Sequence, residues 1–172
     1  ADRRQRLRQA ADDLVSRFGD DLDAIAPSGS NTWTADLTNP ATGTPAEVVD
    51  LEVAANEIYV FAGGRDIGSL GFGGSGGFSS SGTSDWLDTV KTRGEFDRAL
   101  PDDQVFDFGP WGGSIAFDSD GTDWHFGEST DTLDAGENDF LSVAQHEMAH
   151  LLGFSKFNDS FSNFTDETND TF

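Results

Sequence analysis

The sequence predicts an α+β domain, because helical and strand-like patterns both occur along the chain and neither accounts for it alone. Residues 2–18 and 139–153 place apolar side chains at helical spacing. Ile58–Phe61 is a run of β-branched and aromatic residues, which is typical of a strand. The length of 172 residues fits one domain with a small appendage, which we divide into an N-terminal helix and linker (1–44) and a main domain (45–172).

The N-terminal helix is expected over residues 2–18 and is expected to end at Gly19. Its apolar residues recur at helical spacing: Leu7, Ala10, Ala11, Leu14, Val15 and Phe18. Five of the eight arginines of the chain also lie in this segment: Arg3, Arg4, Arg6, Arg8 and Arg17. We interpret these arginines as a solvated basic face that offsets an acidic body.

Strands are expected around residues 32–35, 47–53 and 57–62, where β-branched and aromatic residues gather. Residues 63–82 are rich in Gly and Ser and include a dense glycine run at 71–77. No Gly-Lys-Ser/Thr sequence follows this run, so a phosphate-binding loop is disfavoured. We therefore expect a flexible surface loop or lid there.

A short helix is expected from Asp85 to Thr92, with Ser84 as its cap. The side chains that we expect to face inward are Trp86, Leu87 and Val90. Further strands are expected at 105–108, 114–117 and 123–126, the last two as a pair around an acidic turn.

The composition excludes several classes of function. The net charge of −22 and the pI near 4.1 disfavour nucleic acid and anionic membrane as partners, because both are polyanions. No apolar run approaches 18 residues, so no membrane span is expected. The chain has no Cys, which removes disulfides, thiol nucleophiles and Cys-ligated zinc.

The strongest chemical signal is His146-Glu147-Met148-Ala149-His150, which lies in the predicted helix 139–153. At about 100° per residue, the two histidines lie about 40° apart on one helix face and can point at a single ion. Glu147 projects about 100° away from His146, where a carboxylate can reach a water without being a ligand. A chance match in this composition is expected about 0.002 times. The sequence therefore predicts a zinc site with Glu147 as general base.

The segment around this motif resembles the active-site helix of the metzincin zinc proteases, above all the bacterial matrixin-like enzymes. The motif continues as His150-Leu-Leu-Gly153, which matches the HExxHxxG pattern of that family. Residues 110–118, Trp124 and 139–144 are similar to the preceding strand, loop and helix start, and residues 58–66 resemble an earlier strand. The likeness covers about residues 45–155.

This resemblance implies a metzincin-like catalytic domain over residues 45–172, with a twisted mixed sheet, an active-site helix and an N-terminal helix. It implies that the strand Ser114, Ile115, Ala116 and Phe117 is the edge above a cleft, where a substrate peptide adds by backbone pairing. It also implies peptide hydrolysis with Zn²⁺ as cofactor, in which Glu147 takes a proton from water and passes it to the leaving amine.

The third zinc ligand departs from the family pattern. Lys156 stands at the family's third-ligand position, and a protonated lysine is not a ligand. The later Met turn is also absent, since the single Met is Met148. We expect the third ligand beyond Phe172, because the chain ends look cut from a longer precursor. The alternatives within the chain are His125, Asp159 and Glu167.

A second candidate metal site is the acidic turn at residues 118–123. Asp118, Asp120 and Asp123 can supply hard oxygen ligands to Ca²⁺. The turn lacks the Glu at loop position 12 of an EF-hand, where Ser129 stands. An acidic hairpin turn without calcium is the alternative interpretation.

The sequence thus predicts the N-terminal part of a zinc-dependent endopeptidase that acts on protein or peptide substrates outside the cell. Two alternatives stay open. One is a metallopeptidase relative that has lost catalysis and only binds or scaffolds. The other is an extracellular calcium-binding module in which the two histidines are incidental.

Overall fold

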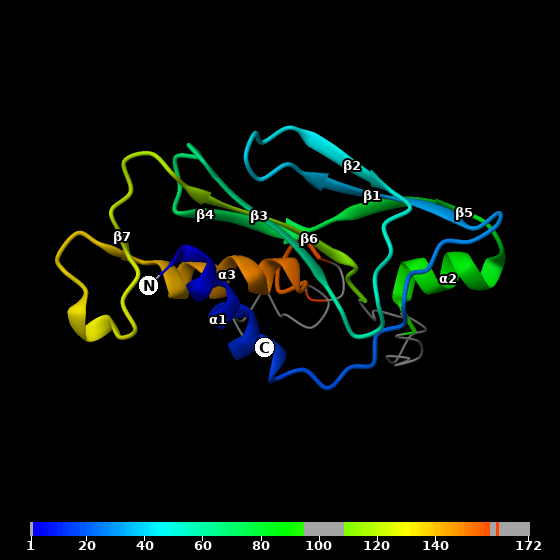
Figure 1. Cartoon of the computed structure of the whole chain (residues 1–172), viewed down its shortest axis with the longest axis horizontal. Coiled ribbons are helices and arrows are strands. Elements are labelled where there is room, and N and C mark those ends of the chain that lie inside the picture. Colours follow the sequence, from blue (N-terminus) through cyan, green and yellow to red (C-terminus); the bar gives the residue numbers. More distant parts are fainter. Residues whose placement is uncertain (1, 95–108, 159–160, 162–172) are drawn as a thin grey trace, which may run out of the picture.

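The computed structural model describes residues 2–94, 109–158 and 161 (Figure 1). Within these residues the fold is α+β, as predicted, and contains three α-helices and several small sheets. The metzincin-like form of this fold stays a prediction. The helices are α1 (Arg3–Val15), α2 (Ser84–Thr92) and α3 (Phe140–Leu151). No helix in the described part of the chain combines the length and apolarity that crossing a membrane requires.

One sheet has the strand order β3-β6-β4, with β3 (Tyr59–Arg65), β6 (Gly112–Asp118) and β4 (Gly71–Ser75). β6 runs parallel to β3 and antiparallel to β4. The prediction that the strand Ser114–Phe117 is the sheet edge is therefore wrong. It lies in the central strand, whose backbone pairs on both sides and whose seven residues are all buried.

A second sheet is antiparallel and has the order β2-β1-β5, with β2 (Pro45–Val49), β1 (Thr32–Thr38) and β5 (Gly77–Ser81). Only Gly76 separates β4 from β5, so one segment passes from the first sheet into the second. The prediction of a flexible loop or lid over residues 63–82 is thus wrong. Gly is required in this segment because a Cβ at Gly76 would collide with the ring of Trp111.

A third, two-stranded sheet pairs β7 (Trp124–His125) with β8 (Asn138–Asp139) in parallel. The expected pairing of 114–117 with 123–126 is not formed, because β6 pairs with β3 and β4 on its two sides and β7 pairs with β8. A short 3₁₀ helix, Thr130–Thr132, lies between β7 and β8. The strand expected at 105–108 lies outside the described residues.

The local prediction for α2 is largely confirmed. The cap is Thr83 rather than Ser84, because the Thr83 hydroxyl accepts a hydrogen bond from the Trp86 amide. Trp86 and Val90 are buried as expected, whereas Leu87 faces solvent. The helix ends at Arg93, which has left-handed backbone.

α1 and α3 cover the same face of the β3-β6-β4 sheet (Figure 1). Their shared core contains these buried residues: Ala10, Ile115, Phe117, Phe140, Ala144, Met148 and Leu151. One of the predicted basic-face arginines, Arg6, is buried and donates to the Phe126 carbonyl at 3.1 Å. Both α1 and β1 precede residue 45 yet contact elements that follow it, and the division at residue 44 stays a prediction.

The second core lies between the β2-β1-β5 sheet and α2 and is rich in tryptophan. Its buried members are Ile25, Trp33, Ala35, Val53, Trp86, Val90 and Trp111. The rings of Trp33 and Trp111 meet edge to face with centroids 5.8 Å apart.

Arg93 connects several segments beside this core. Its side chain is fully buried and donates to four backbone carbonyls at 2.7–3.0 Å. The acceptors belong to Asp23, Ala54, Glu57 and Pro110. Burial lowers the pKa of Arg93 below its usual value, and the nearby Asp23 carboxylate opposes this shift. One guanidinium thus joins three loops to the end of α2.

Candidate functional site

The two motif histidines lie on α3, whose local sequence defines both of its ends. Asp139 caps the helix by accepting a hydrogen bond from the Ser142 amide at 2.9 Å, as expected. Gly153 has a φ of +97° just after the last turn, a conformation that favours glycine. The helix predicted over residues 139–153 is therefore confirmed.

His146 and His150 point their outer nitrogens at the same spot. The two Nε2 atoms are 3.1 Å apart, and the ring planes meet at 82°. Two nitrogens at about 2.05 Å from a tetrahedral zinc ion would be separated by about 3.3 Å. His146 is exposed and His150 is half-buried, so an ion can reach the pair from solvent. This donor pair fits one zinc ion.

A hydrogen bond at Nδ1 fixes the ring orientation of His150. Its Nδ1 lies 2.8 Å from the backbone carbonyl of Phe154, and an N–H there donates to that oxygen. This tautomer leaves Nε2 of His150 unprotonated, so that it accepts the 3.1 Å hydrogen bond from His146 Nε2 in the absence of metal, and an unprotonated Nε2 is the form that a metal binds. The carbonyl is in place because the chain reverses at Gly153 and the Phe154 amide donates back to Ala149.

Glu147 lies on the side of α3 that faces β4. Its side chain is only 7% exposed. A Cβ built on Gly71 would meet the Glu147 carboxylate, and one built on Gly73 would meet the α3 backbone. The glycines of β4 therefore permit the close approach of the strand to this helix.

A small cleft of about 250 Å³ opens beside His150, between β4 and the turn after α3. It is lined by Gly73, Gly74, Ser75, His150, Ser155, Phe157 and Asn158. Phe157 is 88% exposed, although it is a large apolar residue. β4 is an edge of its sheet in the described part of the chain. Neither Phe157 nor the strand β4 was predicted from the sequence as part of the site. The alternating glycines Gly71 and Gly73 were the available sign that this segment packs closely against another element.

Among the described residues, no third ligand lies beside the pair. Within the described residues no group of three His, Asp or Glu side chains is placed to hold a metal ion. His125 is buried elsewhere, with Nδ1 3.3 Å from Glu137 and Nε2 3.1 Å from the Ser129 carbonyl. The other candidates within the chain, Asp159 and Glu167, lie outside the described residues.

The predicted calcium residues are not assembled into a cage in the described structure. Asp120 and Asp123 are exposed, while the Asp118 carboxylate is buried and accepts hydrogen bonds from Thr122 and from the Ile67 amide. These contacts connect the end of β6 to the loop after β3. Calcium binding at this turn stays a prediction.

The Thr122 hydroxyl is the main cause of a lowered pKa at Asp118, with backbone amides adding to it. A lowered pKa in the folded state means that this carboxylate stabilises the fold above its unfolded pKa and that the stabilisation is lost as pH falls through the folded pKa. We expect Thr122→Val to raise the pKa of Asp118 toward 3.8 and to weaken the acid dependence of unfolding. NMR titration of the carboxyl carbon measures this, with the exposed Thr130→Val as control. Equal pKa values in both variants would contradict the assignment.

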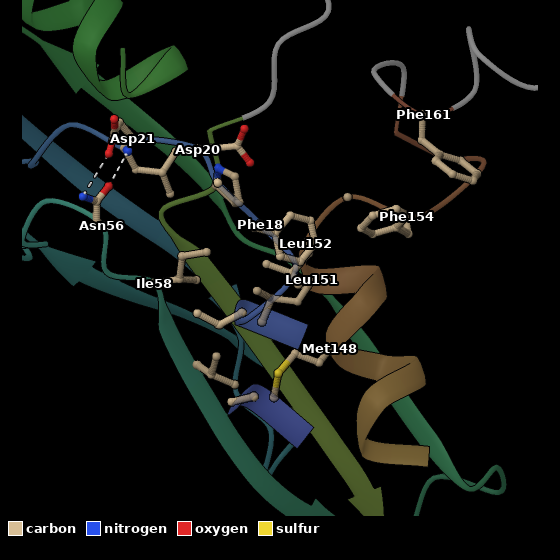
Figure 2. A pocket seen from close by; sticks show the side chains of 17 residues that line it. Phe18, Asp20, Asp21, Asn56, Ile58, Met148, Leu151, Leu152, Phe154 and Phe161 are labelled. Carbon is tan, nitrogen blue, oxygen red and sulfur yellow. Dashed lines mark hydrogen bonds between the residues drawn. The ribbon is translucent and has the colours of Figure 1, made fainter. Parts of the chain in front are cut away.

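A cavity of about 630 Å³ lies on the other face of α3 (Figure 2). Met148, Leu151 and Phe154 contribute to its mainly apolar lining. Met148 is about 180° around the helix from the midpoint of the two histidines. The polar groups at its border are Asp20, Asp21 and Asn56, and none of them is a predicted metal-binding or catalytic residue. The larger cavity is therefore separate from the histidine pair.

No protein-family model, curated protein or solved structure matches this chain.

Proposed function

We propose that this chain is the catalytic part of a zinc-dependent endopeptidase. The observation that carries the proposal is the His146–His150 pair, whose Nε2 atoms converge at 3.1 Å while the Phe154 carbonyl fixes one ring. A zinc ion bound there supplies a Lewis acid for the scissile carbonyl. Glu147 accepts the proton of the attacking water and delivers it to the leaving amine.

The substrate would lie along β4 rather than along β6. Backbone pairing between a substrate peptide and a strand needs a strand edge without a neighbour, and β6 has neighbouring strands on both sides. Gly71, Gly73 and Gly74 carry no side chains that obstruct an approaching backbone. The cleft beside His150 would receive one substrate side chain, with Phe157 as its apolar contact. The proposed substrate class is therefore an extended protein or peptide segment, and its location outside the cell stays a prediction.

A zinc-binding experiment tests the histidine pair. We expect His146→Ala or His150→Ala to weaken zinc binding by at least about 100-fold, because even outer-shell losses cost about 10–100-fold. Isothermal titration calorimetry with ZnCl₂ measures this. His125→Gln is the matched control, since the chain has three histidines and this one lies elsewhere. Unchanged zinc affinity in both alanine variants would exclude the pair as the site.

A metallopeptidase-like binder without hydrolysis is the second candidate. The observation that favours it is the lack of a third metal ligand among the described residues, because catalytic zinc sites usually have three protein ligands. Under this candidate the chain binds zinc and peptide but releases no cleaved product.

A further inference from the structure

The carboxylate of Glu147 lies directly against the backbone of Gly71. Gly71 begins β4 and pairs in register with Phe117 of the central strand. A Cβ at Gly71 would lie 2.6 Å from both Cγ and Oε1 of Glu147, and 2.8 Å from its Cδ. Real Cβ atoms essentially never approach other heavy atoms closer than 3.0 Å. The observed carboxylate position is therefore available only if residue 71 has no side chain.

We propose that Gly71 is a positioning residue for the Glu147 carboxylate. The proposal rests on the proposed function, in which this carboxylate moves the proton. With Gly at 71, the backbone of the edge strand β4 lies against the Glu147 carboxylate and limits its movement on one side. An added methyl group would push the flexible end of Glu147 away and leave the α3 backbone in place. A displacement of about 1 Å at a catalytic group can cost about 100-fold in rate.

Two neighbouring glycines make the test specific, because each meets a different environment. A Cβ at Gly73 would meet the backbone oxygen of Glu147 and would lie 2.9 Å from its Cβ, so Ala there displaces the whole helix. A Cβ at Gly74 would meet no heavy atom within 4 Å. None of the three glycines has the positive φ that makes an alanine strained. Gly74→Ala is thus a matched control for Gly71→Ala on the same strand.

The experiment compares Gly71→Ala and Gly74→Ala in the full chain by three measurements. The first is the ¹³Cδ resonance of Glu147 without added metal, assigned by its loss in Glu147→Gln. The second is zinc affinity by calorimetry, and the third is kcat and KM on a fluorogenic peptide. For Gly71→Ala we expect a shifted resonance, unchanged zinc affinity, and kcat lowered by about 100-fold with KM within about twofold. Gly74→Ala should match the unmodified chain in the Glu147 resonance and in zinc affinity; it is not a kinetic control, because Gly74 lines the proposed substrate cleft.

The outcomes separate this inference from the proposed function. If Gly71→Ala and Gly74→Ala give the same Glu147 resonance, Gly71 does not position the carboxylate and the inference fails, whatever the activity. If the resonance shifts but the unmodified chain cleaves no peptide, the proposed function fails and the positioning role stands. If the unmodified chain is active and Gly71→Ala keeps its kcat, the role in catalysis is refuted. A Gly73→Ala variant should differ from both by a lowered thermal midpoint.

Discussion

Glu147→Ala is expected to lower kcat for peptide hydrolysis by about 10²–10⁴-fold, which is the usual contribution of a general base. The two histidines remain in place in this variant, so zinc binding should persist. Glu147 is buried against β4, so Glu147→Ala removes a buried carboxylate from the fold. We therefore expect the thermal midpoint of the variant to stay close to that of the unmodified chain, although its kcat is lowered. Peptide turnover and calorimetric zinc titration, run on the same preparation, measure the two quantities separately.

The matched control is Glu52→Ala, which removes an exposed carboxylate far from the motif in sequence. It should retain the kcat of the unmodified chain. Undiminished cleavage by Glu147→Ala would refute the proton-transfer role. Tight zinc binding with no cleavage by the unmodified chain would favour the binder without hydrolysis.

Arg93→Met is expected to be the most destabilising single substitution among those considered. The variant removes donors to four backbone carbonyls and leaves one buried and three partly buried hydrogen-bonding positions without the guanidinium. A buried polar group that loses its hydrogen-bond partner costs about 1–3 kcal/mol, so the loss at these four oxygens is a large fraction of a domain's stability. Arg93→Lys should recover little, because one ammonium cannot reach carbonyls on several segments as the planar fork does.

Denaturant unfolding followed by circular dichroism measures this loss as a shift of the midpoint at constant slope. The control is Arg8→Met, an exposed position for which a change within about 0.5 kcal/mol is expected. If Arg93→Met unfolds at the same denaturant concentration as Arg8→Met, the four hydrogen bonds carry no net stability.

The sequence predicted those parts of the site that depend on neighbouring residues. Asp139, the spacing of His146 and His150, and Gly153 all act within one helix and its ends, so periodicity and capping were sufficient. The catalytic assignments drawn from these residues stay predictions. The α+β class followed in the same way from the strongest helix and strand patterns.

The parts that the sequence did not predict depend on contacts between distant segments. Whether Ser114–Phe117 is an edge or a central strand depends on pairing with β3 and β4, which its own residues do not specify. The glycine run of 71–77 resembled a loop because its residues are small, yet close packing against Glu147 and Trp111 is what requires them. Arg93 likewise gives no local sign of its four distant carbonyl partners.

The hydrogen bond from His150 to the Phe154 carbonyl joins two residues only four positions apart in the sequence. The backbone that contacts the Glu147 carboxylate belongs to β4, more than seventy residues earlier. The proposed zinc binding would therefore depend on residues close together in the sequence, and the proposed proton transfer would depend on the assembled tertiary structure. Mild denaturant should consequently uncouple the two: a partly loosened molecule would still sequester zinc after it had lost the arrangement that turns over substrate.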